Sequence, residues 1–193
     1  MIVAGYLIGS IPVGGVVGRA VGFDPRAVGS GNVGMTNVAR AGGKAPAAIT
    51  FIGDILKGLI PVAIARTAGF APGGLAMVAF AAFLGSIASI FLGFSGGRGV
   101  ATSLGLWIVL APLSVAIAAG AFVGVLALSR IVSLASIAAA IVIVPAVAAI
   151  GCPGQYILLA MAVSGLVLLR HRANVRRLMA GEEPRIGDRK IAT

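Results

Sequence analysis

The chain has 193 residues, of which 59% are hydrophobic and 10% are charged, and its mean hydropathy is +1.10. Soluble domains carry about 25% charged residues, so this composition excludes an ordinary soluble domain and predicts an integral membrane protein. The formal net charge is +10, but Lys and Arg gather mainly in 19–44 and 170–190. The positive-inside rule produces such clusters in cytoplasmic segments, and we therefore expect anionic lipids or substrates rather than nucleic acid.

The N-terminal segment has no basic region and no clear cleavage signal. We expect residues 1–18 to form a first spanning helix rather than a removed signal peptide. The single cysteine, Cys152, excludes an intramolecular disulfide and a cysteine-based metal site, and we expect neither a metal nor a cofactor. No long linker divides the chain, so we expect one domain over 1–193, with a basic cytoplasmic tail from about residue 170.

Six apolar runs follow one another along the chain. They cover about 1–18, 46–66, 72–92, 99–128, 131–150 and 154–169. Six spans would place the two basic clusters on opposite sides of the membrane. The run 99–128 exceeds the roughly 20 residues that a span needs, and Pro112 near its middle would break a helix.

Dividing this run at Ala111–Pro112 gives seven helices and brings both basic clusters to one side. The sequence therefore predicts an all-α polytopic membrane protein with seven transmembrane helices, some of them short. Its N-terminus would lie outside and its C-terminus in the cytoplasm. The first short helix cannot cross alone and should lie inside protein or beside a water-filled cavity.

The polar segment Gly29–Arg40 reads GSGNVGMTNVAR. Its G-x-G-x-x-G spacing matches a dinucleotide fingerprint, which requires a preceding strand, whereas a membrane helix precedes it here. Glycines still let backbone N–H groups approach an anion. The side chains that could add donors are those of Ser30, Asn32, Thr36, Asn37 and Arg40. We interpret the segment as a phosphate-binding loop, the alternative being a polar turn with helix caps.

A second glycine-rich segment, Phe94–Thr102, precedes the first short helix. Gly96, Gly97, Arg98 and Gly99 place an arginine and exposed amides at a helix N-terminus, which favours anion binding. The segment is not a Walker A loop, because the required G-x-x-x-x-G-K-[ST] pattern is absent.

A third segment, Arg170–Arg177, follows the last apolar run. His171 and Asn174 are three residues apart and share a helix face. Snorkelling and membrane-surface charge account for the surrounding arginines without any activity, but they do not account for the histidine and the asparagine. These two residues are therefore candidates for a functional role, the alternative being a structural histidine, which is the commoner case.

Two further polar groups are less informative. Asp54 and Lys57 lie three residues apart inside an apolar run, where charges tend to pair and face a cavity. A structural ion pair and a direct substrate contact both fit them. The stretch Ser133–Ser136 (SLAS) indicates only a polar turn with small residues.

In order, the motifs GSGNVGMTNVAR, GDILKG, GGRGVATS, SLAS and HRANVRRLMAGEE resemble signatures of the bacterial membrane glycerol-3-phosphate acyltransferases that use acyl phosphate. The resemblance runs from about Tyr6 to Glu183. It implies seven helices, a cell-membrane location with the site facing the cytoplasm, and transfer of a fatty acyl group to the sn-1 hydroxyl of glycerol 3-phosphate. Lysophosphatidic acid and phosphate would be released in this first step of phospholipid synthesis, and we expect a monomer to suffice.

The resemblance also implies roles for individual residues. Catalytic roles fall on His171, Asn174 and Ser30, and substrate binding falls on Arg40, Arg98, Asn32, Thr36, Asn37, Gly96, Gly97 and Gly99. His171 could be a general base or could orient the substrate. We expect catalysis mainly by approximation and charge stabilisation, since acyl phosphate is already activated.

Departures from the family pattern fall in the second motif. Where the family commonly reads GHxFPxFLxFKGGKGVAT, this chain reads GSIASIFLGFSGGRGVAT from Gly85. Ser86, Ala88, Ser89 and Ser95 replace His, Phe, Pro and Lys, and Arg98 replaces Lys. The changes leave two alternatives beside the active enzyme, a weak or inactive paralogue and a small membrane transporter of a phosphorylated solute.

Overall fold

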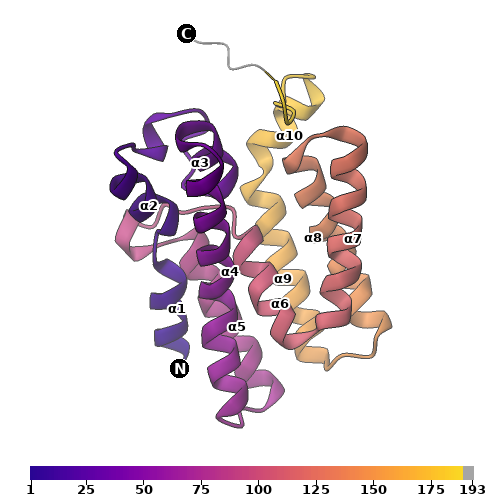
Figure 1. The fold of residues 1–193 in the computed structure, drawn as a ribbon. Helices are drawn as coiled ribbons and strands as arrows, with labels where there is room; N and C mark the ends of the chain where they lie inside the picture. The colour runs from indigo at the N-terminus through magenta and orange to yellow at the C-terminus, as the bar shows by residue number, and fades with distance from the viewer. Residues whose placement is uncertain (189–193) are drawn as a thin grey trace.

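The computed structural model describes residues 1–188, and this part of the chain is a bundle of helices (Figure 1). Residues 189–193 of the predicted basic tail lie outside the described residues. The α-helices are α1 (Ile2–Ser10), α2 (Val13–Val21), α3 (Met35–Gly42), α4 (Lys44–Thr67), α5 (Pro72–Ile87), α6 (Val100–Leu110), α7 (Pro112–Ser129), α8 (Val132–Ala149), α9 (Gly154–Arg170) and α10 (Arg172–Met179). Two 3₁₀ turns lie between helices of this region, η1 (Pro25–Ala27) between α2 and α3 and η2 (Ile90–Leu92) between α5 and α6.

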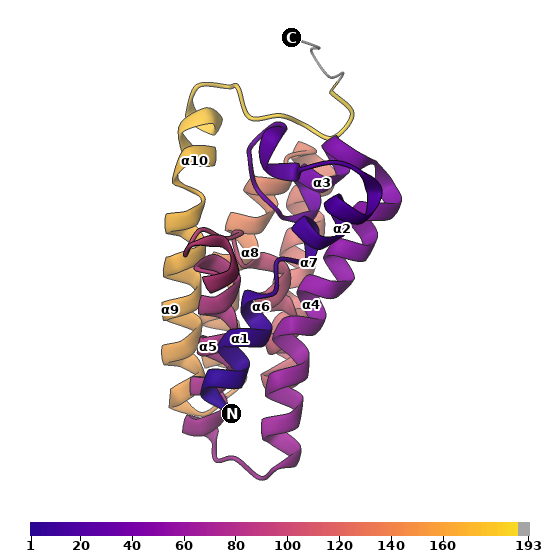
Figure 2. The ribbon, with the colours of Figure 1, turned by 90° about the vertical axis from the view of Figure 1, so that its left-hand side faces the viewer.

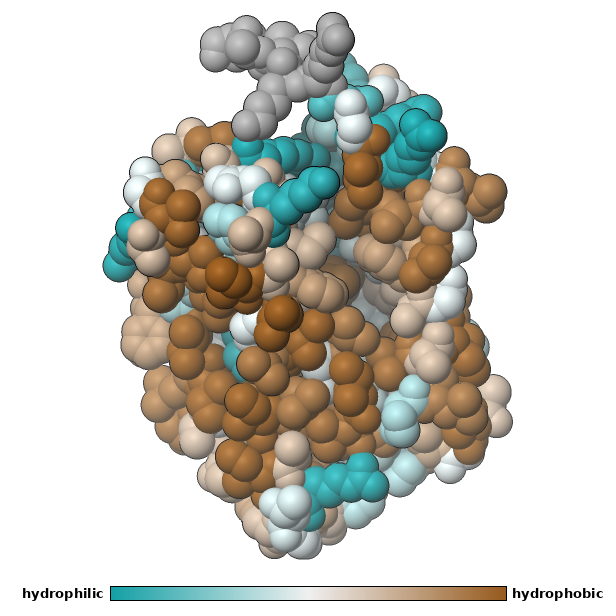
Figure 3. All heavy atoms as spheres, in the orientation of Figure 1, coloured by the Kyte–Doolittle hydropathy of each residue, from teal (hydrophilic) through white to brown (hydrophobic). Residues whose placement is uncertain are grey.

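Within residues 1–188, five stretches are long and apolar enough to span a membrane, which makes the chain a multi-pass membrane protein. They are Ile2–Val21, Lys44–Thr67, Pro72–Leu92, Pro112–Ser129 and Val132–Ala149. The pair α9 and α10, bent by 56°, can supply a sixth, while α6 is a shorter apolar helix. Hydrophobic residues cover the middle of the molecule, and hydrophilic residues gather mainly at the end that carries α3 and α10 (Figure 3).

Two prolines divide the apolar runs. The predicted division at Ala111–Pro112 is confirmed, because α6 ends at Leu110 and α7 begins with Pro112 as its first residue. Proline is favoured there since its missing N–H would be unpaired in any case. The expected first span is present as Ile2–Val21, which is long and apolar enough to cross a membrane, but it is broken, because α1 ends at Ser10 and the chain turns at Ile11–Pro12 before α2.

The short helix α6 starts far below the hydrophilic end of its neighbour α4. The backbone of Gly58 lies against the carbonyl of Thr102, in the first turn of α6. Gly58 is 14 residues from the start of α4, or about 21 Å at the helical rise of about 1.5 Å per residue. As expected, α6 lies largely inside protein, since it packs on α4 and Leu106 and Trp107 are buried in the core, while Ile108 is exposed.

Candidate functional site

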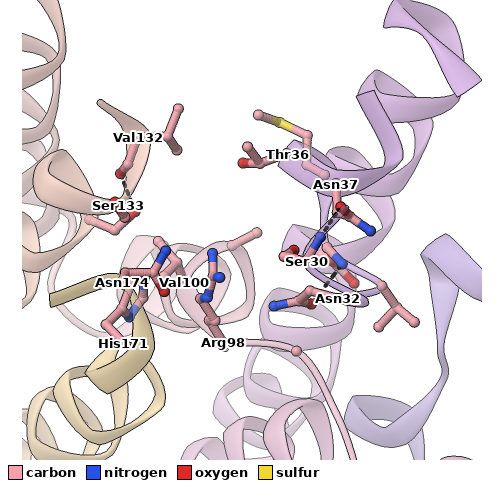
Figure 4. Close-up of a pocket in the computed structure, with 18 of the residues that line it drawn as sticks. Ser30, Asn32, Thr36, Asn37, Arg98, Val100, Val132, Ser133, His171 and Asn174 are labelled. Carbon is pink, nitrogen blue, oxygen red and sulfur yellow. Dashed lines mark hydrogen bonds between the residues drawn. The ribbon is translucent and has the colours of Figure 1, made fainter. Parts of the chain in front are cut away.

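A polar cavity opens at the hydrophilic end of the bundle and encloses about 1020 Å³ of space, including its open mouth. Its wall comes from the 30–40 segment, α4, the start of α6, the start of α8, α10 and the tail, so the three predicted motifs meet in one place (Figure 4). Figure 2 shows α3 and α10 on opposite sides of this end.

The first loop is held in shape by Asn37, a buried side chain of α3. Its Oδ1 accepts a hydrogen bond from Ser30 N at 3.0 Å, and its Nδ2 donates to Pro25 O at 2.6 Å and to Val28 O at 3.0 Å. These bonds occupy both amide hydrogens of Asn37, which lines the cavity but works mainly on the loop backbone. The left-handed backbone at Gly29 and Gly31, with φ of 59° and 66°, suits glycine.

Two glycine amides of the first loop, Gly31 N and Gly34 N, are already hydrogen-bonded, so the start of α3 is the clearer source of open amides. Ser30 N and Gly34 N are already bonded, the latter to Asn32 Oδ1 at 3.0 Å. Helix α3 begins at Met35 without a side-chain cap, and Met35 and Thr36 line the cavity. The uncapped N–H groups and the positive end of the helix dipole there favour an anion.

The second loop presents the start of α6 in the same way. Gly99 has φ of 79° and no side chain caps the helix, while Gly99, Val100 and Thr102 line the cavity beside Arg98. Burial lowers the pKa of the Arg98 guanidinium, which stays charged at neutral pH because an arginine pKa is far higher. Two uncapped helix N-termini and an arginine therefore surround one cavity.

Arg170 stabilises the second loop through two hydrogen bonds to its backbone. Its Nη2 donates to Gly96 O at 2.6 Å and its Nε donates to Gly97 O at 3.1 Å. Gly97 N in turn donates to Ser86 O at 2.9 Å. Gly96 therefore binds Arg170 through its carbonyl and does not line the cavity, whereas Gly97 does.

His171 and Asn174 are both buried and share one side of the cavity, as their spacing predicted. His171 Nδ1 lies 2.8 Å from Val167 O. A carbonyl oxygen only accepts, so in the neutral ring Nδ1 carries the proton and Nε2 is the free acceptor. This tautomer follows from the hydrogen-bond network.

Glu183 is a site residue that the sequence reasoning missed. Its Oε1 accepts from Ser133 Oγ at 2.7 Å and Asn174 Nδ2 at 2.5 Å, and its Oε2 accepts from Arg177 Nε at 2.6 Å. Burial alone would raise the pKa of Glu183, but these three hydrogen bonds outweigh burial, so the pKa lies below its ordinary value of 4.5. The orientation of Asn174 leaves its Oδ1 without a partner among residues 1–188.

Two interpretations of charged residues therefore need correction. Arg170 and Arg177 do more than lie at the membrane surface, since one holds the second loop and the other holds Glu183. One sequence feature could have identified Glu183, namely that the acidic pair Glu182–Glu183 directly follows the arginine-rich segment Arg170–Arg177. The stretch Ser133–Ser136 also contributes more than a turn, because both serines line the cavity.

Asp54 and Lys57 form an ion pair of 2.9 Å within α4, and both line the cavity. Lys57 Nζ also donates to Ile11 O at 3.2 Å, across to the turn between α1 and α2. The ion pair that the spacing allowed is thus present.

An apolar cavity of about 790 Å³ joins the polar one between α6, α7, α8 and α9. Phe51, Val100, Ala101, Phe122 and Ser136 line both. Deeper walls come from Trp107, Val115, Ile143 and Val163. Ala119 and Val123, one helical turn apart on α7, line it and are exposed. A charged site and an apolar slot facing the membrane therefore form one continuous space.

A family model described as glycerol-3-phosphate acyltransferase matches residues 1–181. The chain belongs to the glycerol-3-phosphate acyltransferase family. Among curated members, the glycerol-3-phosphate acyltransferase of Geobacter sulfurreducens is 47% identical over 93% of both chains, and that of Geotalea daltonii is 48% identical over 95% of this chain and 94% of its own.

Two solved structures of the family have the same fold. Both are of PlsY, an integral membrane glycerol 3-phosphate acyltransferase. Its glycerol 3-phosphate form has a TM-score of 0.93 at 39% identity, covering 96% of this chain and 94% of its own. Its lysophosphatidic acid form has a TM-score of 0.90 at 38% identity, covering 96% and 93%.

In this acyltransferase, ten of the eleven residues that the sequence predicted for the site line the polar cavity. They are Ser30, Asn32, Thr36, Asn37, Arg40, Gly97, Arg98, Gly99, His171 and Asn174. Gly96, the eleventh, supports the loop from outside the cavity. The predicted family and the all-α membrane fold are confirmed.

Proposed function

We propose that this chain transfers a fatty acyl group from acyl phosphate to the sn-1 hydroxyl of glycerol 3-phosphate, giving lysophosphatidic acid and phosphate. One observation carries the proposal, namely the continuity of a cationic cavity with an apolar slot. Both substrates bear phosphate and only one bears a long chain, so a site for them needs two anion-binding elements and one apolar channel. The related structures in glycerol 3-phosphate and lysophosphatidic acid forms support these ligand classes.

The two phosphates are held at the starts of α3 and α6. Arg40 and Arg98 add guanidinium groups, whose planar donors suit phosphate oxygens. Ser30, Asn32 and Thr36 add side-chain donors from the first loop. Asn37 and Gly96 serve by holding the loops.

The reaction needs a base for the attacking hydroxyl. His171 Nε2 accepts the proton as the hydroxyl oxygen attacks the acyl carbonyl carbon, and Asn174 Oδ1 orients that hydroxyl as an acceptor. The bond between the acyl carbon and the phosphate oxygen then breaks, and phosphate leaves with the electron pair. Arg98 and the α6 amides stabilise the leaving anion. Acyl phosphate is already activated, so the proposal requires no cofactor, no metal and no acyl-enzyme.

The acyl chain occupies the apolar slot. Residues of α6, α7, α8 and α9 form its walls, so the chain stays in an environment similar to lipid while its activated end reaches the polar cavity. Burying a chain is favourable by about 0.8 kcal/mol per methylene. This gain is relative to water, so a substrate that already lies in the bilayer exchanges lipid for a similar environment and gains little of it.

The proposed topology counts α1 with α2 as one broken span and α6 as one short pass, which gives seven passes. The N-terminus is placed outside and the site faces the cytoplasm, in the bacterial inner membrane. The concentration of arginines at the cavity end supports this orientation. One chain over 1–193 acts as a single domain and as a monomer, because one copy brings all three motifs together.

The deciding experiment supplies purified protein with acyl phosphate and labelled glycerol 3-phosphate, and uses acyl-CoA as the control donor. We expect labelled lysophosphatidic acid with acyl phosphate only. If no product forms with either donor, the proposed acyltransferase activity is refuted. The chain would then be an inactive paralogue, an alternative that the departures at Ser95 and Arg98 in the second loop leave open. Uptake of glycerol 3-phosphate into sealed vesicles without product would favour a transporter instead.

A further inference from the structure

The segment 53–58 of α4, which reads GDILKG, is contacted by α2, which precedes the first loop, and by α6, whose start forms the second anion site. On one side, Gly53 lies against the side chain of Val13 in α2. On the other, Gly58 lies against Thr102 O at the start of α6. A Cβ at either glycine would overlap these atoms, so both contacts depend on the missing side chains.

Lys57 ties α4 to the turn between α1 and α2. Its Nζ donates to Ile11 O at 3.2 Å and pairs with Asp54 Oδ1 at 2.9 Å, and the side chains of Lys57 and Asp54 are only 10% and 15% exposed. The chain turns at Ile11–Pro12, where Ile11 O accepts one hydrogen bond from Val13 N at 3.0 Å within the turn and a second one from Lys57 of α4. Asp54 balances the ammonium charge where an unpaired one would be costly.

Helix α2 transmits this anchoring to the first loop. Gly14, one residue into α2, lies against Val33 O in the loop, at a distance that no side chain could allow. The path therefore runs from Lys57 through Ile11 and α2 to the loop before α3. The contact between Gly58 and Thr102 fixes the start of α6 from the same segment of α4.

We propose that Lys57 is a positioning residue that sets the separation between the two anion sites, without contacting either substrate. The inference rests on the proposed function, since it matters only if two phosphate-bearing substrates must meet. A transfer between two bound substrates needs their reacting atoms about 3–3.5 Å apart, and a displacement of about 1 Å can cost about a hundredfold. The expected signature is a loss of kcat with little change in binding.

The test uses the double variant Asp54→Asn/Lys57→Met, which removes both charges together and leaves neither unpaired in the membrane. We expect its Tm to stay close to that of the wild type. Its kcat should fall about a hundredfold, while the KM for glycerol 3-phosphate and for acyl phosphate stays within about threefold. The single variant Lys57→Arg retains the charge and donors to Ile11 O, and should recover at least about a tenth of the wild-type kcat.

Gly58→Ala gives a second, independent test because it pushes the start of α6 away without altering charge. It should reproduce the loss of kcat. Gly124→Ala is its matched control, since a Cβ at Gly124 on α7 meets nothing within 4 Å, and its kcat should equal that of the wild type.

Several results would overturn the assignment. A wild-type kcat in the double variant would show that the pair positions nothing, and a large rise in one KM with kcat unchanged would make Lys57 a direct ligand. A lowered Tm with normal kcat per folded molecule would leave only a structural role. Failure of the proposed function is distinguishable, because the wild type would then form no lysophosphatidic acid.

Discussion

Replacing Asn37 by alanine removes three hydrogen bonds that shape the first loop. Each links the buried amide to the loop backbone, at Ser30 N, Pro25 O and Val28 O. At about 1 kcal/mol of net stabilisation per bond, the ordered loop loses about 3 kcal/mol. If the loop must be ordered for phosphate to bind, this loss lowers kcat/KM by about a hundredfold.

The assay follows labelled glycerol 3-phosphate into lysophosphatidic acid in purified protein, with the thermal unfolding of each variant measured in parallel. Asn37→Asp is the stricter variant, since it retains an acceptor for Ser30 N but turns an oxygen toward Pro25 O and Val28 O. It should lose at least as much activity as Asn37→Ala. A kcat/KM within about threefold of wild type for Asn37→Ala would refute the reasoning. It would show that the three hydrogen bonds do not contribute about 3 kcal/mol to the loop conformation that binds phosphate.

Arg26→Ala is the matched control in the same loop. Its ion pair with Asp24, at 3.2 Å, is about half exposed on both sides. Exposed pairs contribute about 0–1 kcal/mol, so this variant should retain nearly all of its activity. An equal loss in Arg26→Ala would mean that any change in the loop inactivates the protein.

Three further changes are expected to separate the parts of the site. Arg40→Ala should abolish turnover, whereas Arg66→Ala, at the opposite end of α4, should be nearly silent in the same product assay; equal losses would contradict a site at the α3 end. The folded-state pKa of Glu183 lies below 4.5, so its carboxylate stabilises the fold above that pH and the stabilisation fades as the pH falls through the folded pKa. The Tm of Glu183→Gln should accordingly vary less than that of the wild type between about pH 6 and about pH 3, and parallel curves would argue against the three hydrogen bonds. Ala118→Phe fills the apolar slot and should lower kcat/KM for long-chain acyl phosphates more than for butyryl phosphate; equal reductions would place the chain elsewhere.

Hydrophobicity and charge distribution were enough to predict the fold class and the break at Pro112. A proline inside an apolar run does not always end a helix, because Pro61 and Pro145 lie inside α4 and α8 without ending them. The presence of Pro12 alone therefore did not predict the break between α1 and α2. Part of the environment of the Pro12 turn comes from far along the chain, because Ile11 O accepts a hydrogen bond from Lys57 Nζ, 46 residues away in sequence, as well as one from Val13 N.

The site residues were predictable where they lie in glycine- or arginine-rich motifs, and less so where their role depends on distant partners. Glu183 receives hydrogen bonds from Ser133 and Asn174, which are 50 and 9 residues away. Nothing local distinguishes it from its neighbour Glu182. Asn37 was recognised as part of the motif, but its work on the loop backbone became evident only from its three bonds.

The depth at which α6 begins also bears on how two substrates of opposite solubility can meet. Its first turn lies about 21 Å below the start of α4 along that helix. Lifting an acyl chain into water would cost about 0.8 kcal/mol for each methylene exposed, whereas a small hydrophilic phosphate loses little by entering a wet, cationic cavity. Because α6 begins at this depth, the water-soluble phosphate substrate can reach the acyl chain at the level of the membrane, and the reaction avoids the cost of extracting a fatty chain from the bilayer.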